Sequence, residues 1–301
     1  MYLSIFYFFH VVWSHIKKKE YTYLVDYAKK FYISLWTLIY ISLGIIWAFW
    51  YYQLEYKPLN LEQVTISNGE KTVVFQKMIH IAKPDYYESI AQEIEEYKND
   101  WYVYYFEWVR WWEQENIDKF NQALWIEFDA DLYGNLAKLY NLVPQDNTQF
   151  LNIENTKDIN VDMNIDEIIQ AYEKSKESQN ITQQYTPPVD VNSEIITALW
   201  ELNPRQLKIL QFVNLAFLSA LTKNETVLSW LQNSFWNEIL FNIILEWRNK
   251  VVIQKIINSE DKNIFATYWA LHFDGILKWL QEHNSNWKIV SEKAFFPFAE
   301  K

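Results

Sequence analysis

The chain has no cysteine among its 301 residues. This absence excludes disulfide bonds, thiolate zinc sites and cysteine nucleophiles, and it leaves the redox compartment undetermined. Arginine is also rare, with three positions against 24 lysines, and the formal net charge is −11. No stretch gathers basic residues into a stripe that could follow a phosphate backbone, so we expect no nucleic-acid binding.

Glycine is scarcer than in an ordinary globular chain. It occurs 4 times, whereas average usage of ~7% would give about 20 in a chain of this length. Folds need glycine where the backbone takes a positive φ or where two backbones approach closely. Tryptophan, in contrast, occurs 16 times. This combination is physically unusual for a protein that must make tight turns.

Residues 31–54, FYISLWTLIYISLGIIWAFWYYQL, contain no charged side chain. About 20 helical residues cover the ~30 Å hydrocarbon core of a bilayer. The segment ends in WAFWYY, an aromatic run suited to the membrane interface. A buried core helix is the alternative, but this run is apolar on every face and long for a core helix. We therefore expect a transmembrane helix over residues 31–54.

Five lysines precede this span, at positions 17, 18, 19, 29 and 30. The positive-inside rule makes residues 1–30 cytoplasmic or interfacial and places the chain after residue 55 outside. Residues 1–15 are apolar but short, so they either lie in the interface or form a marginal first span. The apolar run is too long and starts too late for a cleaved signal peptide.

The remainder, residues 60–301, predicts one α/β domain with a central β-sheet flanked by helices. Alternating β-formers around Asn68-Gly69 in 64–82 indicate a hairpin with a two-residue type I′ turn. A helix over 84–100 and a buried strand over 101–109 follow, and this strand-helix-strand order favours an α/β sheet. Residues 145–192 are polar and rich in asparagine, and we expect a surface insertion there.

The periodicity and the turn residues also predict the elements of the rest of the domain. They are a helical stretch over 117–142, two or three helices over 193–258, a strand over 262–272, a helix over 275–283 and a strand over 287–296.

Three chemically active side chains fall at or near predicted strand ends, namely His80, Glu107 and His272. Ligands of open α/β sheets bind at the carboxyl ends of the strands. A carboxylate such as Glu107 in an apolar strand needs a partner or takes a raised pKa. The two histidines are far apart in the sequence, and each is equally compatible with a structural role, because no compact His-Glu-x-x-His pattern is present.

The segment KDINVDMN contains Asp158, Asn160 and Asp162. Their spacing is similar to part of a calcium loop, but the later glycine and glutamate of such a loop are missing. We therefore expect a solvated loop. The sequence also has no nucleophile elbow of the Gly-x-Ser-x-Gly type.

Four segments carry a resemblance to a known family: VVFQKMIHIAKPDYYESIAQEI, YVYYFEWV, EWRNKVVIQKII and IFATYWALHFDGILKWLQ. In this order they resemble the TraB/GumN family, which includes pheromone-shutdown proteins and the Wnt-cleaving Tiki peptidases. The resemblance covers most of residues 64–296. Family members have two Gly-x-x-His motifs, a strand-end glutamate and a helical arginine, which match His80, His272, Glu107 and Arg248.

The resemblance implies a TraB/EreA/ChaN-like fold and metal-dependent hydrolysis of a peptide or a secreted peptide-like signal. It implies that His80, His272 and Glu107 bind a divalent ion such as zinc, manganese or cobalt, which makes hydroxide available near neutral pH. Glu107 is alternatively the general base. Arg248 would hold a substrate carboxylate or stabilise an oxyanion, and Asp274 would orient the His272 imidazole.

The departures from the family pattern are mostly tryptophans where glycine is expected, at Trp108 and Trp269, while Lys77 replaces the glycine of the first motif. Further tryptophans fall at turn-like places, at positions 101, 111, 112 and 125. Because the codons UGA and GGA differ by one base, we hypothesise that the source organism reads UGA as glycine. A genuinely tryptophan-rich chain, from a genome where UGA encodes tryptophan, is the alternative.

Two other functions fit the same sequence. One is a catalytically inactive module that binds and sequesters a peptide at the cell surface. The other is a structural subunit of a membrane complex.

Overall fold

The computed structural model describes residues 24–110, 113–128, 131–151, 158–178, 187–222 and 238–299. The chain divides into two units, Met1–Tyr52 and Gln53–Lys301. Helix α2 (Leu24–Glu55) contains a 24-residue stretch, Lys29–Tyr52, that is long and apolar enough to span a membrane and is not buried. The apolar residues 1–15 and the lysines at 17–19 lie outside the described residues.

The second unit is built on a mixed sheet of six strands in the order β6-β4-β7-β2-β1-β8. Strands β2, β7, β4 and β6 run parallel, whereas β1 is antiparallel to both β2 and β8. The strands are β1 (Leu61–Ser67), β2 (Thr72–Met78), β4 (Val103–Phe106), β6 (Ile159–Asn160), β7 (Asn263–Trp269) and β8 (Lys288–Phe295). The predicted α/β class is confirmed.

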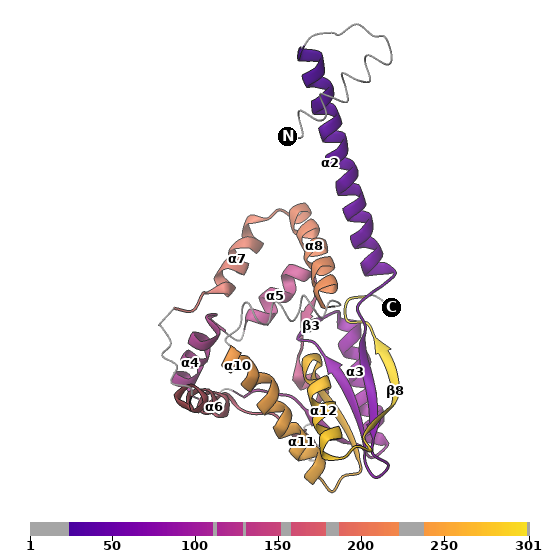
Figure 1. Ribbon diagram of the computed structural model, residues 1–301, viewed down its shortest axis with the longest axis vertical. Coiled ribbons are helices and arrows are strands. Elements are labelled where there is room, and N and C mark those ends of the chain that lie inside the picture. The colour runs from indigo at the N-terminus through magenta and orange to yellow at the C-terminus, as the bar shows by residue number, and fades with distance from the viewer. Residues whose placement is uncertain are drawn as a thin grey trace. The chain divides into compact units, whose positions relative to one another are not determined.

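Helices cover both faces of this sheet (Figure 1). Residues Val73 and Phe75 of β2 pack with helices α11 and α12, whereas Val74 between them packs on the other face with α3. This alternation follows from the two-residue period of a strand. Because both faces are covered, β4 is buried along its whole length and β2 and β7 are buried along most of theirs.

The helices and the short strands have the following bounds. They are α3 (Pro84–Asn99), α4 (Gln114–Leu124), α5 (Leu132–Tyr140), α6 (Ile165–Ser178), α7 (Val191–Glu201), α8 (Pro204–Thr222), α10 (Glu238–Asn242), α11 (Arg248–Asn258), α12 (Phe273–His283), β3 (Ile81–Ala82) and β5 (Val143–Pro144). Single turns lie at Asn147–Phe150 (3-10), Ile243–Trp247 (π) and Ala270–His272 (3-10).

The hairpin between β1 and β2 is present, but its turn is longer than predicted. Ser67 pairs with Thr72, which leaves a four-residue loop instead of a two-residue type I′ turn. The Asn68 side chain accepts hydrogen bonds from the backbone N–H groups of Glu70 and Lys71, and Gly69 takes a φ of 90°. The asparagine side chain thus closes the loop in place of a tight backbone turn.

The prediction of a surface insertion over 145–192 was wrong for its described part. Strand β6 joins the central sheet, and α6 buries Ile165, Ile168 and Tyr172. These positions recur at the three- and four-residue spacing of one helix face, which the many polar residues around them conceal. In the same region the predicted 117–142 helix is two helices, α4 and α5.

Candidate functional site

Four parallel strands bring polar residues to one edge of the sheet. Glu107 directly follows β4, Asp162 lies two residues past β6, His80 lies two residues past β2, and His272 closes the 3-10 turn after β7. The strands are parallel, so these ends share one edge, which is where α/β sheets bind ligands. The structure therefore gathers three of the predicted site residues and adds Asp162.

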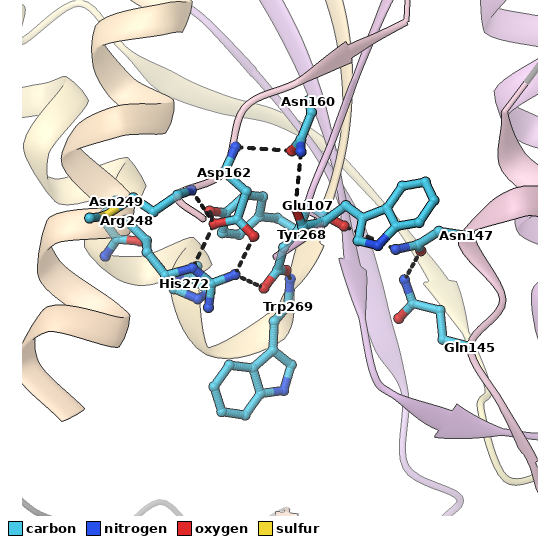
Figure 2. A network of polar contacts seen from close by, with 12 residues as sticks. Glu107, Gln145, Asn147, Asn160, Asp162, Arg248, Asn249, Tyr268, Trp269 and His272 are labelled. Carbon is cyan, nitrogen blue, oxygen red and sulfur yellow. Dashed lines mark hydrogen bonds and ion pairs between the residues drawn. The ribbon is translucent and has the colours of Figure 1, made fainter. Parts of the chain in front are cut away.

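Arg248, the first residue of α11, is the centre of the network (Figure 2). Its Nε donates to Oδ1 of Asp162 at 2.7 Å and its Nη2 donates to Oδ2 at 2.8 Å, while Nη2 also pairs with Glu107. The Tyr268 hydroxyl donates to Asp162 at 3.1 Å. Burial disfavours the charged guanidinium, but the two carboxylates raise the pKa of Arg248 well above its ordinary value. The arginine is a fixed cation held by a fork-shaped ion pair.

Both carboxylate oxygens of Glu107 accept hydrogen bonds in this network. One contacts Arg248, and the other accepts the backbone N–H of Trp269. Its side chain is only 11% exposed. Burial, helped by the charge of Asp162 and opposed by Arg248, raises the pKa of Glu107 above its ordinary value. A carboxylate with a raised pKa is a better proton acceptor near neutral pH.

Two side-chain amides hold the backbone that follows β4. Asn147 donates to the carbonyl of Glu107 at 3.2 Å, and Asn160 donates to the carbonyl of Trp108 at 2.9 Å (Figure 2). Gln145 in turn donates to Asn147 at 2.6 Å. This turn is therefore fixed from two neighbouring segments, which orients Glu107 toward Arg248.

The two histidines are uncharged at neutral pH. Burial, with the nearby charge of Arg248, lowers the pKa of His80 to about 4, and the same causes lower the pKa of His272 well below its ordinary value. His272 is fully buried, and its Nδ1 lies 2.7 Å from Oδ1 of Asn249. Its Nε2 has no hydrogen-bond partner within the described part of the chain. A neutral imidazole of this kind offers a lone pair to a ligand.

The indole of Trp269 lies against both imidazoles. Its ring centroid is 5.6 Å from that of His80 and 5.9 Å from that of His272. Tyr133 covers His80 from α5, with the ring centroids 4.9 Å apart. The tryptophan that the family resemblance marks as a glycine position therefore occupies space beside the two rings.

Two residues singled out from the sequence lie elsewhere. Asp274 is exposed in the first turn of α12, and the bond to Nδ1 of His272 that we expected from it is made by Asn249. Lys77 pairs with Glu62 at 2.7 Å and lies over the Phe273 ring. The ammonium group of Lys77 therefore has an ion-pair partner and an aromatic partner within the fold.

The KDINVDMN segment is not the solvated loop that we predicted. The Asp162 side chain is 0% exposed, and Asp158 pairs with Lys98 at 2.8 Å. The available signal was the pair of apolar residues, Val161 and Met163, that flank Asp162 and are both buried. An acid between two buried apolar residues points to a paired carboxylate, because an unpaired buried charge is costly.

A three-ligand metal site is not assembled in this conformation. Among residues 24–110, 113–128, 131–151, 158–178, 187–222 and 238–299, no group of three or more His, Cys, Asp or Glu side chains is gathered as an ion requires. Glu107 is held by Arg248 and the Trp269 backbone, which leaves the imidazoles of His80 and His272 as the nitrogen groups at this edge of the sheet.

No family model, curated protein or solved structure gives a match to this chain. The resemblance to the TraB/GumN family therefore stays a prediction.

Proposed function

We propose that the chain is a membrane-anchored hydrolase that uses a divalent metal ion to cleave a peptide-like substrate outside the cytoplasm. The observation that supports this proposal most directly is the buried, unpartnered Nε2 of His272. It belongs to a neutral imidazole, near a second neutral imidazole at His80 and near Glu107 with its raised pKa. Clusters of strongly shifted pKa values are typical of functional sites.

The donor chemistry fits a borderline metal such as zinc or cobalt at two imidazoles. His80 and His272 would hold the ion, which lowers the pKa of bound water and polarises a carbonyl oxygen when it is present. Glu107 acts as the proton acceptor in this scheme and not as a ligand. Arg248 is paired with Glu107 and Asp162, so in this scheme it holds the Glu107 carboxylate in position and does not bind the substrate carboxylate.

The proposed location follows from the charges around α2. Lys29 and Lys30 lie at the start of its apolar stretch, Lys29–Tyr52, and the positive-inside rule keeps this end in the cytoplasm. The second unit follows the other end of the helix and is therefore placed outside.

Cobalt(II) binding to the full chain in detergent tests the proposal. We expect one visible-absorbing cobalt ion per chain and loss of binding in His272→Gln. His283→Gln is the matched control, because this histidine is exposed at the end of α12 and should leave binding unchanged. Cleavage of a quenched fluorescent peptide library should depend on the same residue. A wild-type chain that takes up no cobalt contradicts the metal function.

One observation favours the second candidate, an inactive peptide-binding module. The Trp269 indole lies against both imidazoles and occupies space beside them. This alternative predicts saturable binding of peptides that neither added cobalt nor His272→Gln alters, without any cleavage.

A further inference from the structure

The hydrogen-bond environment of His272 identifies which ring nitrogen carries the proton. Nδ1 lies 2.7 Å from Oδ1 of Asn249, and Nε2 has no hydrogen-bond partner in the described residues. A carbonyl oxygen can only accept, so Nδ1 carries the hydrogen and Nε2 keeps its lone pair.

Asn249 itself is placed by the fold with little freedom. It is 2% exposed and follows Arg248 in the first turn of α11, directly after the π-helical turn Ile243–Trp247. Single π-helical turns inside helices often occur at functional sites. Here the turn directly precedes the helix that carries the Asn249 amide to the imidazole.

Gly275 makes room for the Asn249 amide. A Cβ added at Gly275 would lie 2.3 Å from Nδ2 of Asn249, so the Asn249 amide would have to move to make room for it. The chain has only four glycines, and this one sits in a helix where its φ does not demand glycine. Its use at this position is therefore explained by the close approach of Asn249.

We propose that Asn249 is a positioning residue that fixes His272 as the Nδ1–H tautomer and directs the Nε2 lone pair into the candidate site. This inference rests on the proposed function, because the lone pair matters only if His272 binds a ligand. Hydrogen-bond partners of this kind set the tautomer and orientation of ligating histidines.

Two-bond proton–nitrogen correlation spectra of the full chain, labelled with 15N-histidine and free of metal, test the inference. His272→Gln identifies the signals of this ring among the five histidines. We expect Nδ1–H in the wild type, a mixture of tautomers in Asn249→Ala and Gly275→Ala, and retention of Nδ1–H in Asn249→Asp, which keeps an acceptor. Cobalt(II) affinity should fall about tenfold or more in Asn249→Ala and be restored in Asn249→Asp.

A wild-type spectrum with Nε2–H, or unchanged tautomers in both Asn249→Ala and Gly275→Ala, overturns the inference. Asn249→Asp keeps the test decisive if the alanine variants fail to fold. If the tautomers respond as expected but the wild type binds no cobalt, the positioning role stands and the proposed metal function fails.

A second inference rests on a different observation, the ends of three helices. After α3, α4 and α5 the chain makes the same pair of backbone hydrogen bonds, from the positive-φ residue to the carbonyl three residues back and from the next residue to the carbonyl five residues back. This is the Schellman motif, whose left-handed position is usually glycine and sometimes asparagine. The residues there are Trp101 (φ 65°), Trp125 (φ 60°) and Asn141 (φ 56°).

The two left-handed tryptophans are more exposed than Trp287 and lie at the ends of helices. Trp101 is 79% exposed and Trp125 is 38% exposed, whereas Trp287 is buried in the main core and Trp279 donates its indole N–H to Glu246. A bulky residue at positive φ is a genuine outlier. Trp269 has a φ of −53°, a backbone conformation that does not require glycine.

We infer that positions 101 and 125 are glycine in the protein as the source cell makes it, through reading of UGA as glycine. Mass spectrometry of tryptic peptides from that protein, together with the codons, tests the inference. Peptides 99–110 and 120–138 should contain glycine at positions 101 and 125, encoded by UGA. Peptide 279–288 is the control and should keep both of its tryptophans. UGG codons at 101 and 125, or tryptophan masses there, overturn the inference.

Discussion

The side chains of Arg248 and Asp162 are joined by two parallel hydrogen bonds of 2.7 and 2.8 Å, although 86 residues separate them in the sequence. Both side chains are almost inaccessible to solvent, at 5% and 0% exposure. The pair connects the end of β6 to the start of α11 and, through Glu107, to the end of β4. The ion pair therefore holds three separate segments of the site in one geometry.

Asp162→Asn should destabilise the fold, because it leaves the buried Arg248 guanidinium with one carboxylate in place of two. Removing one partner of a buried ion pair costs about 3–5 kcal/mol. Urea unfolding of the full chain in detergent measures this change. Asp274→Asn is the matched control, since Asp274 is exposed nearby, and it should stay within about 0.5 kcal/mol of the wild type. Equal stability of the two variants would contradict the role of Asp162.

Trp101→Gly should stabilise a chain that is expressed with tryptophan at this position. A left-handed conformation costs a non-glycine residue about 1–2 kcal/mol, and the exposed Trp101 loses little packing when it is removed. Trp101→Ala removes the indole but keeps the Cβ, so it should not give the same gain. Asn141→Gly should have a smaller effect, because asparagine tolerates positive φ. Unfolding midpoints that rank the variants differently would argue against backbone strain at position 101.

Much of the fold could be predicted because its pattern is local. The β-forming residues of β1 and β2 and the three- and four-residue spacing in α3 both appear within a few neighbouring residues. Strand β6 could not be found this way, since it has two residues, Ile159 and Asn160, and exists only because β4 offers it hydrogen bonds. Pairing with a distant strand leaves no periodic signal in so short a segment.

The residues of the candidate site also differ in whether the sequence alone could predict them. The place of His80, Glu107 and His272 at the sheet edge was predictable because each lies at or just past the end of an apolar strand. Asp162 gave only the weaker signal of its two apolar neighbours, and Asn249 gave none, because its role depends on packing between segments far apart in the sequence. Nothing local distinguishes Asn249 from the other asparagines of the chain until α11 and α12 are placed side by side (Figure 1).

The unfolding free energy of the metal-free chain should fall as the pH is lowered, because the folded chain holds its buried-site histidines in the neutral form. The pKa of His80 is lowered from 6.5 to about 4 by folding, so the unfolded chain binds more protons in this window and stability is lost as the pH falls from 6.5 toward 4. The expected loss at pH ~5 is about 2 kcal/mol. Glu107 has a raised pKa and works in the opposite direction, so the comparison needs a variant.

His80→Gln isolates this contribution. The difference in unfolding free energy between wild type and variant should shrink by about 2 kcal/mol between pH ~7 and pH ~5, while His283→Gln should retain the wild-type pH dependence. Parallel pH curves for wild type and His80→Gln would show that the buried imidazole does not favour its neutral form.

The absence of cysteine makes the orientation of the chain directly measurable. In a membrane-impermeant maleimide assay on intact cells, Glu70→Cys should be labelled, because residue 70 is exposed in the β1–β2 loop of the unit that we propose to lie outside. Lys30→Cys lies at the start of the stretch that is long and apolar enough to span a membrane and should be labelled only after lysis. The wild-type chain supplies the blank, since it has no thiol. Labelling of Lys30→Cys but not Glu70→Cys in intact cells would reverse the proposed orientation and move the candidate site into the cytoplasm.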